Sequence, residues 1–169
     1  MVKVFTFTLQ NCPSHTMSFL TGEFECKLDP KFRMMIPAGL KKKLPELESE
    51  GLVINRGFEK YLVIYTKKEW DKRLEDLSKL NEYEEDNIAF IRYFTRGATE
   101  LMPDAAGRVL LPKFLLEYAG IKGDVVLACQ LNKIEVWDAE AHRKLMDDEP
   151  KSFSALAKKV MGGKNKEQE

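Results

Sequence analysis

The sequence predicts an α+β protein built from two tandem repeats with flanking helices. Three observations predict this class. One stretch of the chain matches a later stretch at a constant offset, several short segments alternate apolar and polar residues, and others carry apolar residues at helical spacing. Hydrophobic residues make up 44% of the 169 residues, so the chain can form a packed core and is not disordered as a whole.

The internal repeat joins residues 19–40 to residues 94–115 without a gap, at an offset of 75 residues. The identical pairs in this register are Phe19 with Phe94, Gly22 with Gly97, Glu25 with Glu100, Asp29 with Asp104, Arg33 with Arg108, Pro37 with Pro112, and Leu40 with Leu115. Residues 51–70 resemble residues 124–143 more loosely. We therefore expect each half to fold as strand, turn, strand, short helix, strand, turn, strand and helix.

The first half begins with a strand over residues 23–28, where Phe24, Cys26 and Leu28 alternate with charged residues. A proline is tolerated in the first turn of a helix, where its missing N–H would have no partner. Pro37 and Pro112 therefore predict helices over residues 38–47 and 113–119, the second ended by Gly120.

Two hairpins follow these short helices. Residues 52–54 with 62–65, and residues 125–129 with 134–137, are rich in β-branched and aromatic side chains and predict paired strands. Each half is therefore expected to contain one such hairpin.

Three further helices are predicted outside the repeated stretch. Residues 67–80 place Trp70, Leu74 and Leu77 on one face, and residues 87–94 place Ile88, Ile91 and Phe94 together. Core packing is the expected role of both stripes. After Pro150, Ser152 can cap a short helix that carries Phe153, Leu156 and Val160, followed by a polar tail.

Composition and motifs exclude several classes of function. Lys plus Arg and Asp plus Glu both number 27, so the net charge is zero and a uniformly basic nucleic-acid binder is excluded, although a local basic patch is not. No stretch is long and apolar enough for a membrane helix, and the N-terminus is a poor signal peptide. The sequence predicts no membrane association and no small-molecule substrate.

The residues that usually form catalytic or metal sites are sparse. Cys12, Cys26 and Cys129 form no C-x-x-C pair, which favours a reduced, cytoplasmic compartment. His15 and His142 have no companions at metal-ligand spacing. No nucleophile has a recognisable base and no phosphate loop occurs, so we expect no enzyme activity, no metal and no cofactor.

The repeat contains one pair of oppositely charged residues in each copy, Asp29 with Arg33 and Asp104 with Arg108. Each pair spans a predicted turn between two strands, where the Asp can accept backbone N–H bonds. One interpretation is a self-satisfied turn in which the Arg only pairs with the Asp. The other is that the Asp holds the Arg so that its planar guanidinium meets an anion or a guanine edge.

Lysines surround the first of these turns. Lys31 lies within it, and Lys41, Lys42 and Lys43 follow on the next predicted helix. One interpretation is a local basic cluster, which the zero net charge of the whole chain does not reveal. The other is that these lysines only form a solvated helix face.

At these residues the sequence resembles the MraZ family of bacterial transcriptional regulators, whose halves are each a SpoVT-AbrB-type swapped-hairpin module. The matching segments are GEFECKLDPKFRMMIP, LVINRGFEKYLVIYTKKEW, DAAGRVLLP and NKIEVWD, and together they span residues 18–143. The resemblance implies an AbrB-like swapped-hairpin β-barrel and a ring-shaped homo-oligomer. It also implies binding to direct repeats in the promoter of the cell-division and cell-wall gene cluster, including the protein's own promoter, usually as a repressor at the nucleoid.

The resemblance also implies a domain organisation. Residues 1–17 are an N-terminal extension, 18–69 and 96–143 are the two SpoVT-AbrB-like modules, 70–95 is a helical connector, and 144–169 hold a C-terminal helix and the polar tail. The family's two Asp-Arg turns map onto Asp29, Lys31 and Arg33, and onto Asp104, Gly107 and Arg108. The chain departs from the family at Phe32, where a glycine is usual.

These observations give a specific hypothesis for DNA binding. Arg33 reads a guanine through O6 and N7, Lys31 contacts a phosphate, and Asp29 holds Arg33 in place. Arg108 and Asp104 either repeat this role or serve the barrel or a subunit contact. Lys41 and Lys42 extend the basic patch. The alternative is an antitoxin-like module that captures a protein partner on the same scaffold.

Overall fold

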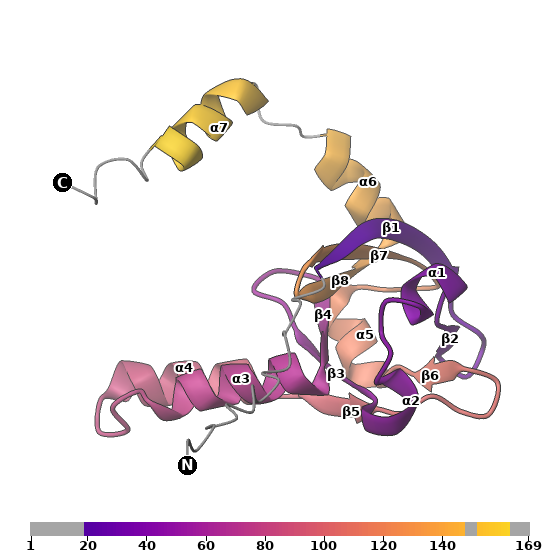
Figure 1. The fold of residues 1–169 in the computed structure, drawn as a ribbon, viewed down its shortest axis with the longest axis horizontal. Helices are drawn as coiled ribbons and strands as arrows, with labels where there is room; N and C mark the ends of the chain where they lie inside the picture. Colours follow the sequence, from indigo (N-terminus) through magenta and orange to yellow (C-terminus); the bar gives the residue numbers. More distant parts are fainter. Residues whose placement is uncertain (1–18, 148–151, 163–169) are drawn as a thin grey trace, which may run out of the picture.

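The structure of the chain is a computed structural model that describes residues 19–147 and 152–162. The N-terminal extension and most of the polar tail expected from the sequence lie outside the described residues. The described part is a mixed α+β fold in which strands surround the short helix α5 (Lys113–Ala119), as Figure 1 shows.

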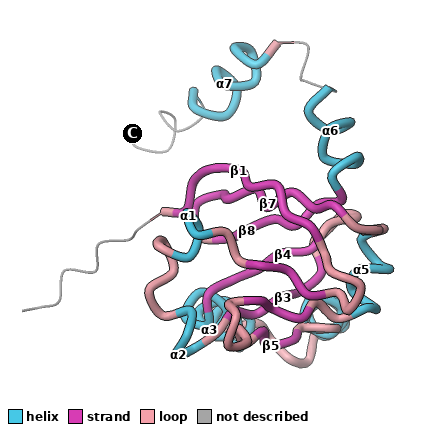
Figure 2. Tube along the Cα trace, turned by 90° about the vertical axis from the view of Figure 1, so that its right-hand side faces the viewer, coloured by secondary structure: helices cyan, strands magenta, loops and turns pink. Residues whose placement is uncertain are grey.

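Six strands form one antiparallel sheet in the order β1-β7-β8-β4-β3-β5. Their bounds are β1 Leu20–Lys27, β3 Leu52–Arg56, β4 Leu62–Thr66, β5 Thr99–Leu101, β7 Asp124–Leu131 and β8 Lys133–Asp138. Figure 2 shows these strands one above another in that order. Two further strands, β2 (Arg33–Met35) and β6 (Arg108–Leu110), pair with each other in a separate two-stranded sheet. The two predicted hairpins, β3–β4 and β7–β8, are therefore confirmed.

The strand pairing follows the internal repeat but crosses between its halves. The first strand of each half pairs with the third strand of the other half, β1 with β7 and β5 with β3. The second strands pair with each other, as do the fourth strands, β4 and β8. Neither half therefore forms its sheet alone. In the described residues β1 and β5 stand at the two ends of the hydrogen-bonded order, so the closed barrel expected from the resemblance is not found.

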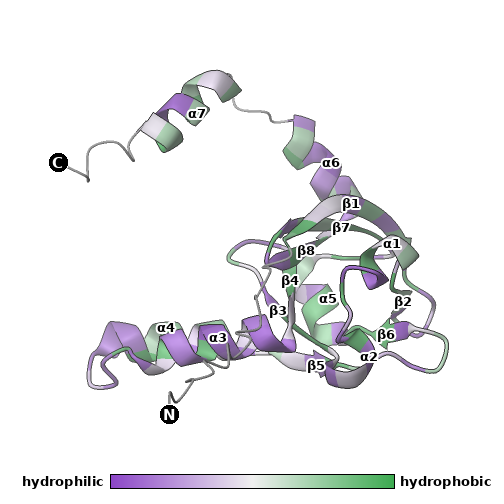
Figure 3. Cartoon of the chain, in the orientation of Figure 1, coloured by the Kyte–Doolittle hydropathy of each residue, from purple (hydrophilic) through white to green (hydrophobic). Residues whose placement is uncertain are grey.

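The main core lies between this sheet, the β2–β6 pair and α5. Met34, Val109, Leu111 and Leu115 are all almost fully buried within it. Hydrophobic residues gather on α5 and on the strands around it, coloured green in Figure 3. Gly120 ends α5 with φ 68° and ψ 22°, the left-handed cap that a glycine adopts without strain, as the sequence predicts.

The corresponding helix of the first half is broken, which corrects the prediction of one helix over residues 38–47. The chain instead forms α1 (Ala38–Lys41) and α2 (Leu47–Glu50). Pro45 lies between them and cannot donate the backbone hydrogen bond that a continuous helix needs. The second half has no proline inside this helix, so α5 continues unbroken.

Helices α3 (Lys67–Ser78) and α4 (Glu85–Thr95) form an antiparallel pair that projects from the sheet (Figure 1). Only the base of this pair enters a core: Trp70 is buried, and its ring stacks on Phe94 with 5.7 Å between ring centroids. Leu74 and Ile88 are more than one-third exposed, so the prediction that both apolar stripes pack in the core is wrong at these residues. The projecting ends have no sheet to cover them.

Two helices follow the last strand, α6 (Ala139–Asp147) and α7 (Phe153–Gly162). Ser152 accepts a hydrogen bond from the Ala155 N–H at 3.2 Å, so the predicted N-cap of α7 is confirmed. The apolar residues Phe153 and Val160 are exposed. Among the described residues, no helix combines the length and apolar character needed to cross a bilayer.

Candidate nucleic-acid interface

The first Asp-Arg turn lies between β1 and β2 and is held by the Asp29 carboxylate. Its Oδ1 accepts hydrogen bonds from the Lys31 N–H at 2.8 Å and the Arg33 N–H at 2.9 Å. Its Oδ2 accepts from Arg33 Nε at 2.7 Å and pairs with Arg33 Nη2 at 2.7 Å. One carboxylate therefore fixes both the turn and the arginine side chain.

The second turn, between β5 and β6, repeats this network atom by atom. Asp104 Oδ1 accepts from the Ala106 and Arg108 N–H groups, each at 2.9 Å. Asp104 Oδ2 lies 2.9 Å from Arg108 Nε and 2.8 Å from Arg108 Nη2. The repeated sequence motif thus encodes a repeated local structure, and each arginine has its own carboxylate.

Phe32 occupies the position of Gly107 without changing the turn. Its φ is 61°, compared with 80° for Gly107, so both residues are in the left-handed region. The Phe32 N–H donates to the Asp29 carbonyl at 2.9 Å, as the Gly107 N–H donates to the Asp104 carbonyl at 2.8 Å. A side chain in this conformation costs about 1–2 kcal/mol. The departure from the family pattern therefore adds strain but leaves the geometry of Arg33 intact.

Both carboxylates are held in the charged state. The backbone N–H of Arg33, followed by its side chain and the Lys31 N–H, lowers the pKa of Asp29 below its ordinary value of 3.8. The Arg108 backbone N–H and side chain lower the pKa of Asp104 in the same way. Each turn therefore keeps a paired carboxylate and guanidinium at neutral pH.

Each guanidinium has one edge that its carboxylate does not engage. The carboxylate engages the edge formed by Nε and Nη2, so the edge formed by Nη1 and the outer hydrogen of Nη2 is directed away from it. The Arg33 and Arg108 side chains are 30% and 34% exposed. A planar fork with one edge fixed and one accessible suits bidentate binding to a phosphate or to guanine O6 and N7.

Strands β2 and β6 bring the two turns together in one short ribbon. Arg33 pairs across the ribbon with Leu110, and Met35 with Arg108. The two arginines therefore lie on the same face of the ribbon, at the side of the molecule opposite α3 and α4 in Figure 1. The sequence alone does not predict this pairing, because each turn is encoded within its own half and no local pattern joins the two.

The predicted lysines have different environments. Lys31 and Lys42 are exposed, and neither makes an ion pair with another described residue. Lys41 pairs with Glu48 at 2.6 Å and lines a hollow of about 340 Å³ beside the second turn, not the first. Lys43 donates to the Thr21 carbonyl at 2.7 Å. The basic cluster is thus spread over both turns, and only part of it is available to a ligand.

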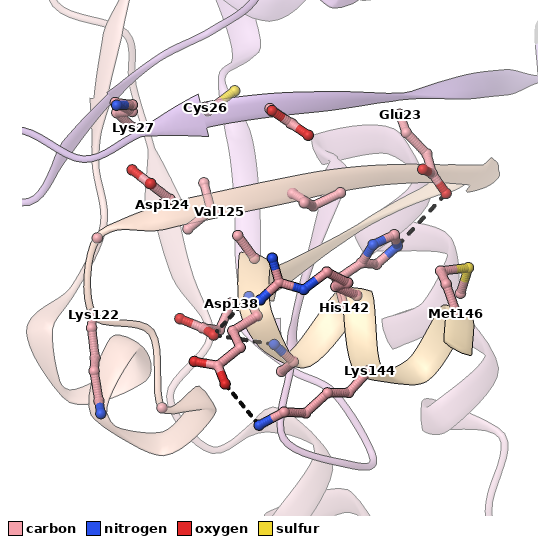
Figure 4. A pocket seen from close by; sticks show the side chains of 18 residues that line it. Glu23, Cys26, Lys27, Lys122, Asp124, Val125, Asp138, His142, Lys144 and Met146 are labelled. Carbon is pink, nitrogen blue, oxygen red and sulfur yellow. Dashed lines mark hydrogen bonds and ion pairs between the residues drawn. The ribbon is translucent and has the colours of Figure 1, made fainter. Parts of the chain in front are cut away.

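A larger hollow, of about 1200 Å³, lies between α6 and strands β1 and β7 (Figure 4). Two contacts join charged or titratable side chains in its lining: Lys144 pairs with Glu140 at 2.8 Å, and Glu23 lies 3.6 Å from His142 Nε2. Burial raises the pKa of the Cys26 thiol in this hollow to about 11, so the thiol is protonated at neutral pH. The hollow therefore offers no activated nucleophile at Cys26.

The described residues contain no group of three or more His, Cys, Asp or Glu side chains that could hold a metal ion. The ribbon with its two Asp-Arg turns combines partly exposed charge with a fixed geometry and carries it twice.

Comparison with known proteins identifies the family. The chain matches the family described as "MraZ protein, putative antitoxin-like" twice, over residues 19–92 and 94–162. It is 41% identical to the Transcriptional regulator MraZ of Flavobacterium psychrophilum over 150 residues, which cover 88% of this chain and 96% of the relative. Identity is 35% to the protein of that name from Cytophaga hutchinsonii, covering 89% of this chain and all of the relative. Identity is 38% to the protein of the same name from Christiangramia forsetii, covering 85% of this chain and 93% of the relative. The chain therefore belongs to the MraZ family.

Proposed function

We propose that this chain is a sequence-specific DNA-binding transcriptional regulator that represses the cell-division and cell-wall gene cluster, including its own promoter. The relatives named above carry the name Transcriptional regulator MraZ. The observation that carries the proposal for this chain is the pair of carboxylate-held guanidiniums, Arg33 and Arg108, on one exposed ribbon. On this proposal the protein acts at the nucleoid in the cytoplasm.

In the proposed complex the ribbon enters the major groove, whose width admits two β-strands. Arg33 reads a guanine, and Arg108 reads a second one from the other end of the ribbon. Asp29 and Asp104 fix the two side chains before DNA arrives, so little rotamer freedom is lost on binding. Lys31 and Lys42 contact phosphates, and Lys41 does so by exchanging Glu48 for a phosphate oxygen.

A single copy with no net charge has little general attraction to DNA, so the proposal includes a ring-shaped homo-oligomer. A ring presents several identical ribbons, and direct repeats about one helical turn apart engage neighbouring copies. Apolar side chains that stay exposed on α4 and α7, such as Phe90 and Phe153, are surface that another copy can cover.

We also propose that residues 18–69 and 96–143 are two AbrB-type swapped-hairpin modules joined by a helical connector, residues 70–95. The support is the exchange of strands between the halves, in which β1 pairs with β7 and β5 with β3. Such an exchange within one chain resembles the exchange between two copies of a single module.

The experiment that tests this function is binding of the purified chain to fragments of its own upstream region, at two salt concentrations. We expect preference over random DNA of the same length, and a loss of about 1–3 kcal/mol per engaged site for Arg33→Ala. Arg92→Ala is the matched control, because Arg92 is an exposed arginine on α4 away from the ribbon. Unchanged binding by Arg33→Ala at physiological salt would show that this assignment is wrong.

A second candidate function is an antitoxin-like module that captures a protein. The family description favours it, since it contains the words antitoxin-like. Preference for the upstream fragment over random DNA separates the two candidates, because protein capture alone predicts no such preference.

A further inference from the structure

The outer face of the β2–β6 ribbon carries two large apolar side chains as well as the two arginines. Met34 and Val109 face one another at the centre of the ribbon and are fully buried, each 0% exposed. Side chains alternate along a strand, so their neighbours point the opposite way. On that outer face Met35 is 52% exposed and Leu110 is 59% exposed.

The strand register fixes where these apolar residues lie relative to the guanidiniums. Met35 is directly opposite Arg108, and Leu110 is directly opposite Arg33. The arginines therefore occupy one diagonal of the face and the apolar residues the other. A Cβ on Gly107 would lie 3.8 Å from Met35 Sδ, so Met35 also borders the second Asp-Arg turn. The same arrangement of arginine, buried residue and exposed apolar residue occurs in both halves of the repeat.

Single exposed apolar side chains are common on protein surfaces and need no explanation. Here, however, each apolar residue faces an arginine whose guanidinium is already fixed by a carboxylate, and this arrangement occurs twice on the ribbon. A surface shaped only for phosphates has no use for two large apolar groups between its cations. The chemistry of the face instead matches a ligand that offers hydrogen-bond acceptors and apolar groups side by side.

The floor of the DNA major groove has this composition. Guanine presents the O6 and N7 acceptors there, and thymine presents its C5-methyl group, the apolar group that proteins read in this groove. Residues two apart on a strand are separated by about 6.6 Å, close to two base-pair steps of about 3.4 Å each. Residues directly opposite across the ribbon are separated by about 5 Å. A base that contacts Met35 or Leu110 thus lies one or two base pairs from the guanine bound by the nearer arginine.

We propose that Met35 and Leu110 contact thymine methyl groups beside the guanines that Arg33 and Arg108 bind, and so help to set the sequence preference of the protein. This inference rests on the proposed DNA-binding function and adds specificity-determining residues to it. The other possible occupant of the ribbon face is a second copy of the chain, which the experiment distinguishes.

The test removes only the methyl groups. The upstream fragment of the chain's own gene is prepared with deoxyuridine in place of every thymidine, and its affinity is compared with that of the normal fragment at the same salt. We expect the wild-type protein to bind the uracil fragment about fourfold to fifteenfold more weakly, as one or two methyl contacts are lost. The double variant Met35→Ala/Leu110→Ala should bind the normal fragment more weakly by a similar factor and should not distinguish the two fragments.

The matched control is Met146→Ala, which truncates an exposed methionine on α6 and should keep the full response to uracil. Both ribbon residues are exposed, so their truncation leaves the buried core intact. If the double variant nevertheless failed to fold, the single variants Met35→Ala and Leu110→Ala would be compared on the two fragments, and each should lose part of the response to uracil.

Two results would overturn the inference and leave DNA binding in place. One is equal binding of both fragments by the wild-type protein while Arg33→Ala loses affinity. The other is a changed sedimentation coefficient of Met35→Ala/Leu110→Ala without DNA, which would make the pair a contact between copies. Failure of the wild-type protein to prefer its own fragment over random DNA would instead remove the proposed function and this inference together.

Discussion

The two Asp-Arg turns form the same hydrogen-bond network, although they differ at the residue before the arginine. Asp29 and Asp104 each accept two backbone N–H groups and hold an arginine, although one turn contains Phe32 where the other has Gly107. The carboxylate, and not the glycine, is therefore what fixes the turn, while the glycine only lowers its strain. The turns differ in charge as well, since Lys31 of the first aligns with Ala106 of the second.

The largest expected effect comes from removing the arginines one at a time. Arg33→Ala and Arg108→Ala should each weaken binding to the upstream fragment by about 1–3 kcal/mol per engaged site, because each removes a bidentate contact to a base. Arg33→Ala should cost more, because the first turn also carries the proposed phosphate contact of Lys31 and so engages the DNA more closely. Titration of both variants and of Arg92→Ala on one fragment measures the difference. A loss for Arg33→Ala with none for Arg108→Ala would mean that the second turn serves a structural role.

The carboxylates should matter next, through the position of each guanidinium. Asp29→Asn and Asp104→Asn keep the shape of the turn but lose the charge that pairs with the arginine, so both should weaken DNA binding less than loss of the arginine itself. They should also weaken binding more on specific DNA than on random DNA. An equal effect on the two DNAs would contradict a positioning role.

The same two variants give a dependence of stability on pH. Because folding lowers the pKa of Asp29 and Asp104, the unfolded chain binds more protons near and below pH 3.8, and stability falls as the pH drops through that range. Urea unfolding at pH 7 should show both variants less stable than the wild type, and the difference should shrink at pH 3. A difference that stays constant between these pH values would show that the carboxylates are not charged and paired as described.

A smaller effect is expected from exchanging the lysine between the turns. Lys31→Ala should lower the slope of log affinity against log salt by about 1 per engaged site, because one phosphate contact is lost, without changing which DNA is preferred. Ala106→Lys, which gives the second turn the residue of the first, should raise the slope by a similar amount. The measurement is a salt titration of all three proteins, and a Lys31→Ala variant with an unchanged slope would place Lys31 away from the DNA.

The smallest effect concerns backbone strain. Phe32→Gly should raise the free energy of unfolding by less than about 1 kcal/mol, since relief of the left-handed strain is partly offset by the extra entropy of the unfolded glycine. Gly107→Ala should lower it by about 1 kcal/mol, because alanine is strained at that φ. Urea unfolding measures both changes. If Phe32→Gly were clearly destabilising, the Phe32 ring would have to make a stabilising contact that outweighs the strain.

Much of the fold could be predicted because it depends on local pattern. The helix over residues 113–119 ends at Gly120 as expected, and both hairpins form where β-branched residues cluster. The break at Pro45 could also have been foreseen, because the proline is visible in the sequence and interrupts the helix for a local reason.

The candidate site could be predicted only in part. The repeated Asp and Arg indicate the two turns, since their spacing of four residues is read directly from the chain. The pairing of β2 with β6, which brings Arg33 and Arg108 onto one face, joins segments 75 residues apart and has no local pattern of its own. The exposure of Leu74 and Ile88 likewise depends on α3 and α4 projecting from the sheet, which periodicity does not reveal.

On the proposed function, Arg33 and Arg108 read guanine in the major groove with the guanidinium edges that their carboxylates leave unengaged. The most direct test replaces guanine with 7-deazaguanine in the upstream fragment, which removes the N7 acceptor and leaves base pairing intact. We expect wild-type affinity to fall to nearly that of the Arg33→Ala/Arg108→Ala variant, and we expect this variant to bind both fragments equally. Wild-type affinity that is unchanged by 7-deazaguanine would contradict this role of the two arginines.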